Sequence, residues 1–323
     1  MKIAVLDDYQ NAVKSLAATQ KLAGHEVTSI DHALSGEALT RELVDVDAVV
    51  LNMQRTKMPA DVINALPKLK FISQTGKNAG HLDLAAATAR GIVVSAGGAG
   101  SPAAVSELTW GLILSSFRHI PDEVAALKGG RWQTTVGTGL TGKTLGVYAY
   151  GRIGSLVANV GSAFGMKVLV WGREMSTAKA REAGYEAASS REAFFAEADV
   201  VTLHLALNAE TKGIVTAEDL GRMKPTALLV NTSRAELVAP GALVEALKRG
   251  RPGFAALDVF EQEPIAKSDP LLSMPNVIAT PHLGYVEAKV YDNIYGAAFD
   301  QVAAFAAGAP INVLNPDAVG KKG

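Results

Sequence analysis

The sequence predicts an α/β protein with two doubly wound, parallel-sheet domains and a cleft between them. The chain has 323 residues, which is enough for two domains with apolar cores of their own. Short apolar runs alternate with longer stretches of helical spacing, a pattern typical of βαβ units. Because these runs are continuously apolar, we expect strands that helices cover on both faces of each sheet.

The apolar runs place the strands in order along the chain. Strands are expected at residues 3–6, 46–51, 71–73, 145–149, 168–171, 200–205, 228–231, 254–259 and 277–279. The first run ends at Asp7 and Asp8, so it is interpreted as a buried strand and not as a targeting segment. Nowhere do 18 apolar residues follow one another without a charge, so no membrane span is expected and a cytoplasmic location is predicted.

One long helix is expected directly after the glycine-rich stretch at residues 97–100. Ser101 is a candidate N-cap and Pro102 a candidate first helical residue, and the helix should continue to about Phe117. Its apolar side chains cover most of its circumference, which predicts burial on several sides. A subunit interface would explain that burial, so we expect a homodimer.

The two parts of the chain are weakly similar to each other, and glycines mark the boundary between them. Gly97-Gly98-Ala99-Gly100 is a flexible stretch that could serve as a hinge. After its first strand the N-terminal part has Asp7-Asp8-Tyr9, whose carboxylates would repel a pyrophosphate. The later part has Gly151-Arg152-Ile153-Gly154 at the same place, so only this part is expected to bind a dinucleotide.

The glycine motif lies between an expected strand and an expected helix, as in a Rossmann-like dinucleotide site. Gly151 would let the backbone approach a pyrophosphate, and Gly154 would let the helix pack close to the strand. The first position of the usual motif holds Ala149, which is small but adopts a positive φ less cheaply than glycine. A purely structural tight turn is the alternative, because the motif taken alone is weak.

The end of the next strand should decide which cofactor binds. Arg173 facing the adenosine ribose would favour NADPH by roughly ten- to a hundredfold, through a charge-assisted bond of about 1.5 to 3 kcal/mol. Glu174 facing the ribose would favour NADH instead. A solvated Arg-Glu pair is the third alternative. We therefore expect NAD(P), with NADP(H) slightly favoured through Arg173.

Composition excludes several other functions. Lys and Arg together number 31 and Asp and Glu 32, so nothing global favours nucleic acid or an anionic membrane. The absence of cysteine excludes thiol catalysis, disulfides and Cys-ligated metal centres. The six histidines show no short ligand spacing, so no metal site is expected. Redox chemistry would need a bound organic cofactor.

Three loops that follow expected strands carry groups suited to the reduction of a 2-oxo acid. Arg234 could hold the substrate carboxylate with a planar, bidentate guanidinium. His282 could protonate the new alkoxide, and a neighbouring carboxylate would raise its pKa above the usual value of about 6.5. Glu263 and Glu261 both qualify as that carboxylate, because spacing alone cannot choose between them.

Several motifs in the right order resemble the D-isomer-specific 2-hydroxyacid dehydrogenases, over almost the whole chain. They are Gly151-Arg152-Ile153-Gly154, Leu203-His204-Leu205, Glu210-Thr211-Lys212-Gly213, Asn231-Thr232-Ser233-Arg234, Leu257-Asp258-Val259-Phe260, Glu263-Pro264, Thr280-Pro281-His282 and Pro310-Ile311-Asn312-Val313. The resemblance implies that Arg234, Glu263 and His282 are the catalytic trio and favours Glu263 over Glu261.

The resemblance also assigns the surroundings of the trio. It implies that Asp258 lies by the nicotinamide, and the cofactor contacts would be completed by Thr232, Ser233 and Gly284. The loop of Gly76, Lys77 and Asn78 matches the family's substrate-carboxylate loop, although Lys77 on such a loop is more often simply solvated. A split architecture is implied, with a substrate-binding domain of residues 1–99 plus 286–323 and a dinucleotide-binding domain of residues 100–285.

The resemblance implies an NAD(P)-dependent D-2-hydroxyacid dehydrogenase, with glyoxylate- or hydroxypyruvate-type substrates favoured. The chain departs from the family at Tyr285, where an aromatic ring would lie beside the site, and at Ala206 and Ala235. These departures bear on substrate identity more than on reaction type. The alternative is an NAD(H)-sensing, non-catalytic binding protein of the corepressor type.

Overall fold

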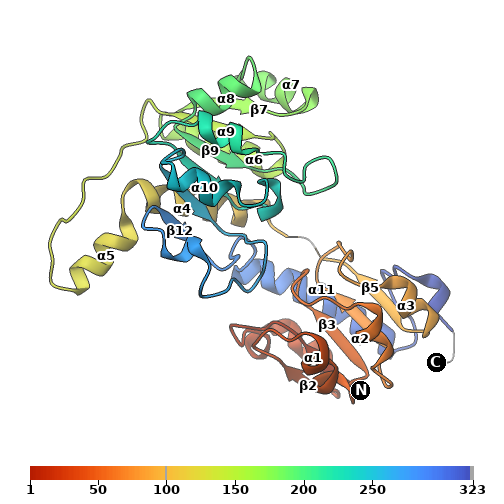
Figure 1. The fold of residues 1–323 in the computed structure, drawn as a ribbon. Coiled ribbons are helices and arrows are strands. Elements are labelled where there is room, and N and C mark those ends of the chain that lie inside the picture. The colour runs from red at the N-terminus through yellow and green to blue at the C-terminus, as the bar shows by residue number, and fades with distance from the viewer. Residues whose placement is uncertain (99, 321–323) are drawn as a thin grey trace. The chain divides into compact units, whose positions relative to one another are not determined.

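The computed structural model describes residues 1–98 and 100–320, so Ala99 of the expected hinge lies outside the described residues. The chain divides into two compact units, one of Met1–Gly100 with Glu287–Gly323 and one of Ser101–Val286. Each unit has a parallel sheet with helices packed against it (Figure 1), which confirms the predicted α/β class. Among the described helices, none is long and apolar enough to cross a bilayer.

The first unit has a five-stranded parallel sheet in the order β2-β1-β3-β4-β5. Its strands are β1 (Lys2–Val5), β2 (Glu26–Ser29), β3 (Ala48–Leu51), β4 (Phe71–Gln74) and β5 (Val93–Ala96). The chain runs from β1 to β2 and then crosses back to β3 on the other side of β1. Doubly wound sheets bind ligands at the carboxyl ends of the strands where such a reversal occurs.

Alternate side chains of the central strands build two apolar layers in this unit. Ile72 points into the core under α1 (Gly36–Leu43), α2 (Ala60–Asn64) and α3 (Leu84–Ala89). Phe71 points to the other face, where its ring stacks on Phe305 of α11 (Ala288–Ala306) with centroids 4.4 Å apart. The short turns η1 (Val13–Ser15), η2 (Ala17–Leu22) and η5 (Pro316–Ala318) complete the unit.

The C-terminal segment returns to the edge of this sheet. Val313 forms an antiparallel bridge with Ser95 of β5, and the Leu314 amide donates to the Val94 carbonyl at 2.8 Å. The Val94 amide donates in turn to Asn315 Oδ1 at 2.8 Å. These bonds satisfy edge groups that would otherwise be open to another chain.

The second unit has a seven-stranded parallel sheet in the order β12-β11-β10-β9-β6-β7-β8. Its strands are β6 (Thr144–Tyr148), β7 (Lys167–Trp171), β8 (Glu186–Ala187), β9 (Val200–Leu203), β10 (Leu228–Asn231), β11 (Phe254–Leu257) and β12 (Val277–Ala279). The strand order reverses between β6 and β9. The loops that follow β6, β7, β9, β10, β11 and β12 therefore lie along one edge of the sheet, where a dinucleotide site is expected.

Helices cover both faces of this sheet. α4 (Pro102–Phe117) and α6 (Arg152–Ala163) pack against each other on one face, and α7 (Glu174–Glu182) lies beside β7. The other face carries α8 (Arg191–Glu197), α9 (Ala217–Arg222) and α10 (Ala242–Lys248), with η3 (Ala235–Leu237) and η4 (Pro270–Ser273) in the loops. The burial of α4 comes from α6, β10 and β11 of the same unit, so it does not require the subunit interface that the sequence suggested.

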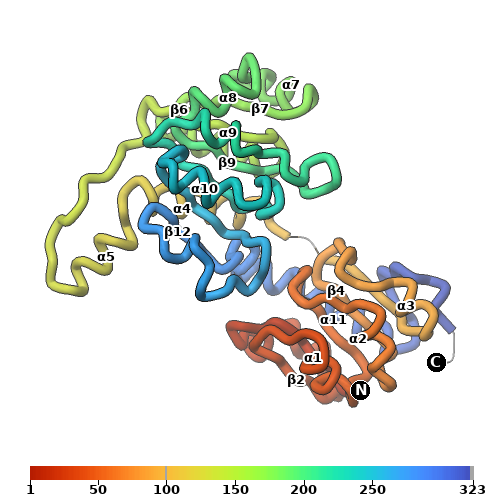
Figure 2. The backbone as a smooth tube through the Cα atoms, in the orientation of Figure 1, coloured from red at the N-terminus to blue at the C-terminus, as the bar shows by residue number. Residues whose placement is uncertain are grey.

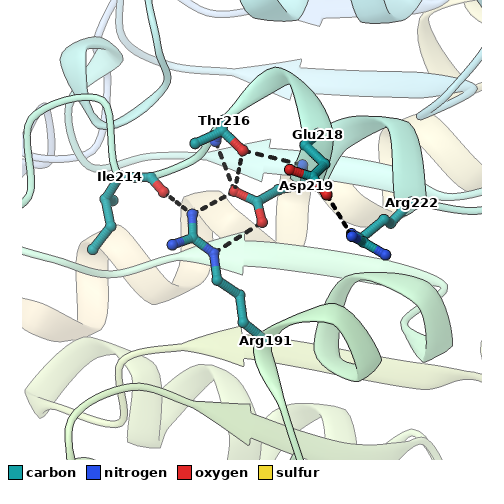
Figure 3. Close-up of polar contacts among 6 residues, drawn as sticks. All are labelled: Arg191, Ile214, Thr216, Glu218, Asp219 and Arg222. Atoms are coloured by element: carbon teal, nitrogen blue, oxygen red, sulfur yellow. Dashed lines mark hydrogen bonds and ion pairs between the residues drawn. The ribbon is translucent and has the colours of Figure 1, made fainter.

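A polar network ties the helices of the second face together. Arg191 at the start of α8 donates to both carboxylate oxygens of Asp219 and to the Ile214 carbonyl (Figure 3). Asp219 also accepts from the amide and hydroxyl of Thr216, which caps α9. Since this carboxylate is buried, the guanidinium supplies the partner that a buried charge requires.

One part of the second unit projects away from its sheet. Helix α5 (Ile120–Lys128) is followed by an irregular segment, residues 129–140, which runs as an extended arm (Figure 2). Its Trp132 and Val136 side chains are 76% and 94% exposed. Glu123 of α5 holds the arm by accepting from the Thr134 and Thr135 hydroxyls, and these bonds lower the pKa of Glu123 to about 2.

Two half-buried histidines with buried ring nitrogens should make the fold sensitive to acid. Burial lowers the pKa of His81 and of His204 to about 4, and both imidazoles bury ring nitrogens that have no partner among the described residues. In the unfolded chain these imidazoles bind protons near pH 6.5, while in the folded chain they stay neutral down to a lower pH. The free energy of unfolding therefore decreases as the pH falls below 6.5. We expect each histidine to remove about 1.5 kcal/mol from the free energy of unfolding between pH 6.5 and 5.

Urea unfolding at both pH values tests this expectation. Replacement of His81 or His204 by leucine should flatten the pH dependence by about that amount. His32→Leu is the matched control, because His32 is exposed and bound at the surface to Asp31. An equal pH dependence in all four proteins would contradict the prediction.

Candidate active site

The glycine motif forms a tight turn between β6 and α6. Gly151 is the N-cap of α6, and the space where its side chain would lie is open, which leaves room for a pyrophosphate. At Gly154 a Cβ would lie 2.3 Å from the Ala149 carbonyl oxygen, so only glycine allows the helix to start this close to the strand. No side chain of the described residues caps this helix, and its first amides, including those of Arg152 and Ile153, can face an anion.

Ala149 adopts the left-handed conformation, which costs an alanine more free energy than a glycine. Its φ is +76°, and its amide donates to the Trp171 carbonyl at 2.8 Å, which fixes the turn. A left-handed alanine costs about 1 kcal/mol relative to glycine. Ala149→Gly should therefore raise the free energy of unfolding by up to about 1 kcal/mol, measured by urea unfolding. A loss of stability would show that the methyl group contributes packing that outweighs the strain.

The residues after β7 lie beside the glycine turn. The Tyr150 amide donates to Ser176, which fixes the glycine turn against the start of α7. Glu174 is directed along α7 and forms an exposed ion pair with Arg181 at 3.3 Å. Arg173 is exposed, and its carbonyl accepts from the Ser176 amide at 2.8 Å at the start of α7.

The loop after β10 holds Arg234 through its backbone. Asn231 accepts from the Ser233 amide at 3.0 Å and donates to the Arg234 carbonyl at 2.9 Å, so one buried side chain closes the turn. Ser233 donates to the Leu205 carbonyl at 2.6 Å. The Thr232 hydroxyl lies 2.9 Å from that of Thr109, in α4. The Arg234 guanidinium is half-buried, and its Nη1 donates to the Ser233 carbonyl.

A histidine and a carboxylate meet in the loops after β11 and β12. Glu263 Oε2 lies 2.8 Å and Oε1 3.0 Å from His282 Nδ1, and both side chains are about one-fifth exposed. Glu263 Oε1 also accepts from the Phe260 amide, which folds the loop back toward the histidine. Glu261, which the sequence left as an alternative, has an exposed side chain.

Asp258 fixes the turn that carries His282. Its carboxylate is fully buried and accepts from the Thr280 hydroxyl at 2.7 Å, the Leu283 amide at 2.6 Å and the Gly284 amide at 2.9 Å. Burial raises the pKa of Asp258, while these bonds and the nearby His282 act in the opposite direction. His282 itself has φ +54°, a conformation that persists only where the surroundings impose it.

The loop after β4 in the first unit is held close to Met53. Gly76 is buried, and a Cβ there would come within 3.0 Å of the Met53 sulfur. Gln74, the last residue of β4, donates to the Met53 and Asn78 carbonyls, and these bonds order the loop that follows. Lys77 and Asn78 are exposed. Each unit thus presents its predicted site residues at the carboxyl edge of its own sheet.

The contacts that support the site were harder to predict than the residues that form it. Asn231 and Phe260 were predicted only as members of motifs, with no contact assigned to either of them. Asn-Thr-Ser after a buried strand is a sequence signal for an Asx turn, and it could have identified the role of Asn231. The bond from the Phe260 amide to Glu263 has no such signal, because it depends on the path of the loop.

The fold and the glycine turn place the chain in the class of doubly wound, dinucleotide-binding α/β proteins. Residues 110–284 match the family model described as D-isomer specific 2-hydroxyacid dehydrogenase, NAD binding domain. The chain belongs to this family.

Individual relatives agree with the family model. The chain is 39% identical over 289 residues to a D-3-phosphoglycerate dehydrogenase of Methanocaldococcus jannaschii, covering 88% of this chain and 53% of that protein. It is 33% identical to a glyoxylate reductase of Aeropyrum pernix, covering 88% of this chain and 87% of that protein. The chain therefore spans about half the length of the D-3-phosphoglycerate dehydrogenase and most of the glyoxylate reductase.

A solved structure shows the same fold. The crystal structure of an oxidoreductase from Ralstonia solanacearum superimposes with a TM-score of 0.94 and 49% identity, covering 99% of this chain and 98% of that chain.

Proposed function

We propose that this protein is an NAD(P)-dependent D-2-hydroxyacid dehydrogenase that reduces small 2-oxo acids. The observation that carries the proposal is the pairing of His282 with Glu263 on a turn pinned by Asp258, at the same sheet edge as the glycine turn. The glyoxylate reductase relative, which matches the chain over most of its own length, favours glyoxylate as a substrate, and the resemblance to the family adds hydroxypyruvate.

The residues of the second unit have complementary tasks in this proposal. Arg234 holds the substrate carboxylate, because a guanidinium offers two parallel donors to it. His282, with Nδ1 held by Glu263, gives the proton on Nε2 to the carbonyl oxygen as the alkoxide forms. Glu263 steadies the imidazolium before transfer and keeps the ring in one orientation afterward. The reverse reaction returns the proton from the hydroxyl group to Nε2.

The cofactor would be held by the residues that line the glycine turn. Gly151, Arg152, Ile153 and Gly154 offer amides and an open surface to the pyrophosphate, and Thr232, Ser233, Asp258 and Gly284 would surround the nicotinamide. When bound, the reduced nicotinamide supplies the hydride that adds to the carbonyl carbon. In the first unit, the loop of Gly76, Lys77 and Asn78 would offer backbone amides to an anion.

Turnover of a substrate panel tests the proposal. Purified protein is mixed with NADH or NADPH and with glyoxylate, hydroxypyruvate, pyruvate or phenylpyruvate, and cofactor oxidation is followed at 340 nm. We expect glyoxylate and hydroxypyruvate to give the highest kcat/KM. The absence of turnover with every pair, in protein that binds the cofactor, would overturn the proposal.

The preference for the cofactor phosphate is a separate proposal. Arg173 supports NADPH because it is exposed at the end of β7, while Glu174 is paired with Arg181 along α7. We expect the ratio of kcat/KM for NADPH to that for NADH to fall roughly tenfold in Arg173→Ala. Lys179→Ala, which removes another exposed cation of α7 and leaves the Glu174 pair intact, is the matched control. An unchanged ratio in Arg173→Ala would remove the case for phosphate recognition.

A homodimer built through the α5 arm is the proposed assembly. The groove between α4, α5 and the arm has a volume of about 580 Å³. Its lining combines apolar side chains, such as Leu114, Val124 and Leu127, with the charged side chains of Arg118, Glu123 and Arg131. Trp132, which is 76% exposed, is an apolar anchor of the kind that subunit interfaces bury. A second copy is the occupant we propose, since a two-fold axis buries both arms at once.

Sedimentation at micromolar concentration tests this assembly. The wild-type protein should sediment as a dimer, and the double variant Trp132→Ala, Val136→Ser should shift toward the monomer. At protein concentrations above the dissociation constant, the variant should keep the thermal unfolding curve of the wild type. Phe164→Ser, at another exposed apolar position on the same unit, is the control and should leave the dimer intact. A monomeric wild-type protein would contradict the proposal.

A further inference from the structure

Tyr285 brings an aromatic ring against the proposed proton donor. Its ring centroid lies 5.9 Å from that of His282, and the two ring planes cross at 78° in an edge-to-face arrangement. Both residues are half-buried. Such pairs are attractive because the positive edge of one ring meets the negative face of the other. This contact lies outside the Arg234, Glu263 and His282 trio and needs its own explanation.

The turn that carries both residues makes the ring contact rigid. The Val286 amide donates to the Leu283 carbonyl at 2.8 Å, which closes a turn over 283–286 and brings Tyr285 back toward His282. Asp258 holds the same turn by accepting from the Leu283 and Gly284 amides. The backbone of this turn therefore fixes the point from which the tyrosine ring approaches the imidazole.

Glu263 and Tyr285 restrain different motions of the imidazole. The hydrogen bond to Glu263 fixes the position of Nδ1, but it still permits the ring to tilt about that contact. A ring packed at 78° to the imidazole plane opposes this tilt, because tilting would break the edge-to-face contact. The direction of Nε2 depends on the tilt, and proton transfer depends steeply on that direction.

We propose that Tyr285 is a positioning residue, whose ring orients the His282 imidazole so that Nε2 points to the substrate's carbonyl oxygen. The inference rests on the proposed function, because it explains how the His282 imidazole, the proton donor of that function, is oriented. The phenol hydroxyl plays no part in this role, so phenylalanine should replace tyrosine. A substitution that removes the aromatic ring should lower kcat about two- to tenfold, the range expected from the strength of such ring pairs.

Three variants separate the ring from the hydroxyl and from simple volume. Tyr285→Phe keeps the ring, Tyr285→Leu keeps much of the apolar volume, and Tyr285→Ala removes both. We expect Tyr285→Phe to retain kcat within about twofold, while the leucine and alanine variants lose two- to tenfold in kcat with little change in KM for NADH or NADPH. Equal kcat values in all four proteins, or an equal loss in Tyr285→Phe, would overturn the inference.

A spectroscopic measurement tests the ring contact independently of turnover. In protein labelled with ¹³C-histidine, the Hε1 resonance of His282 is assigned by its disappearance in His282→Asn. The ring current of Tyr285 should shift this resonance, so it should move in Tyr285→Leu and Tyr285→Ala and stay near its wild-type position in Tyr285→Phe. A resonance that does not move when the ring is removed would show that the two rings are not in contact.

The two readouts distinguish failure of the inference from failure of the proposed function. Wild-type protein without turnover, but with the expected shifts of the His282 resonance, would reject the dehydrogenase activity while the ring contact stands. Wild-type turnover with no effect of ring removal on kcat would reject the positioning role and leave the activity in place. Thermal unfolding of each variant shows whether a lower kcat reflects loss of folded protein.

Discussion

Replacement of His282 by asparagine should lower kcat for 2-oxo acid reduction by about 10²- to 10⁴-fold, the usual contribution of a general acid. The imidazole lies 2.8 Å from Glu263 through Nδ1, so Nε2 is the ring atom proposed to carry the proton. Asparagine tolerates the left-handed backbone at this position, where φ is +54°, so the turn should survive the substitution. KM for the cofactor should therefore stay within a few-fold of the wild-type value.

Glu263→Gln separates charge from geometry at the same site. Glutamine can still accept a hydrogen bond from Nδ1, but it cannot stabilise the imidazolium, so kcat should fall by about tenfold and less than in His282→Asn. Glu261→Gln is the matched control, because Glu261 is two residues away and exposed. Steady-state kinetics of the three variants at neutral pH gives the comparison. If Glu261→Gln lost more activity than Glu263→Gln, the assignment of the orienting carboxylate would be wrong.

The continuous apolar strands were the easiest elements to predict. The strands at 228–231 and 277–279 appear with the predicted bounds as β10 and β12, since each is a compact apolar run next to polar loops. Other predicted strands are one to two residues off at an end, as at 200–205, where β9 ends at Leu203. The chain leaves the sheet there although Leu205 continues the apolar pattern.

Three edge strands, β2, β5 and β8, could not be found by the same signal, whereas the fourth edge strand, β12, was predicted. β2 has the sequence Glu26-Val27-Thr28-Ser29, and its exposed and half-buried positions alternate because it lies at the sheet edge. β5 also lies at an edge, and the C-terminal segment completes its hydrogen bonds. β8 has only two residues. An edge strand needs few apolar side chains, so its place is decided by the neighbouring strand and not by its own composition.

The site followed from the fold more than from any single motif. In a parallel sheet, the loops after neighbouring strands emerge at one edge, so Arg234, Glu263 and His282 could be assigned to the same edge from the predicted strands. The choice between Glu261 and Glu263 could not be made from spacing, because it depends on how the loop folds back through the Phe260 amide. Similarly, Tyr285 could be placed beside the site, but the angle of its ring comes from the turn over 283–286.

Replacement of Arg234 should be the most damaging substitution for substrate binding. Two charge-assisted hydrogen bonds to a carboxylate contribute about 1.5 to 3 kcal/mol each, so Arg234→Gln should lower kcat/KM for 2-oxo acids by about 10²- to 10⁴-fold. The loop should keep its shape in the variant, because Asn231 binds the backbone carbonyl of residue 234 and not its side chain. Cofactor binding, measured by the fluorescence of bound NADH or NADPH, should change little.

Arg234→Lys makes the geometric part of this prediction testable. Lysine keeps the positive charge but offers no planar pair of donors, so it should recover only part of the loss, mainly in KM. Arg222→Lys is the matched control, since Arg222 forms an exposed pair with Glu218 at the end of α9 (Figure 3) and should retain wild-type kinetics. Full activity in Arg234→Lys would mean that this position supplies charge alone. Full activity in Arg234→Gln would mean that another cation holds the substrate carboxylate.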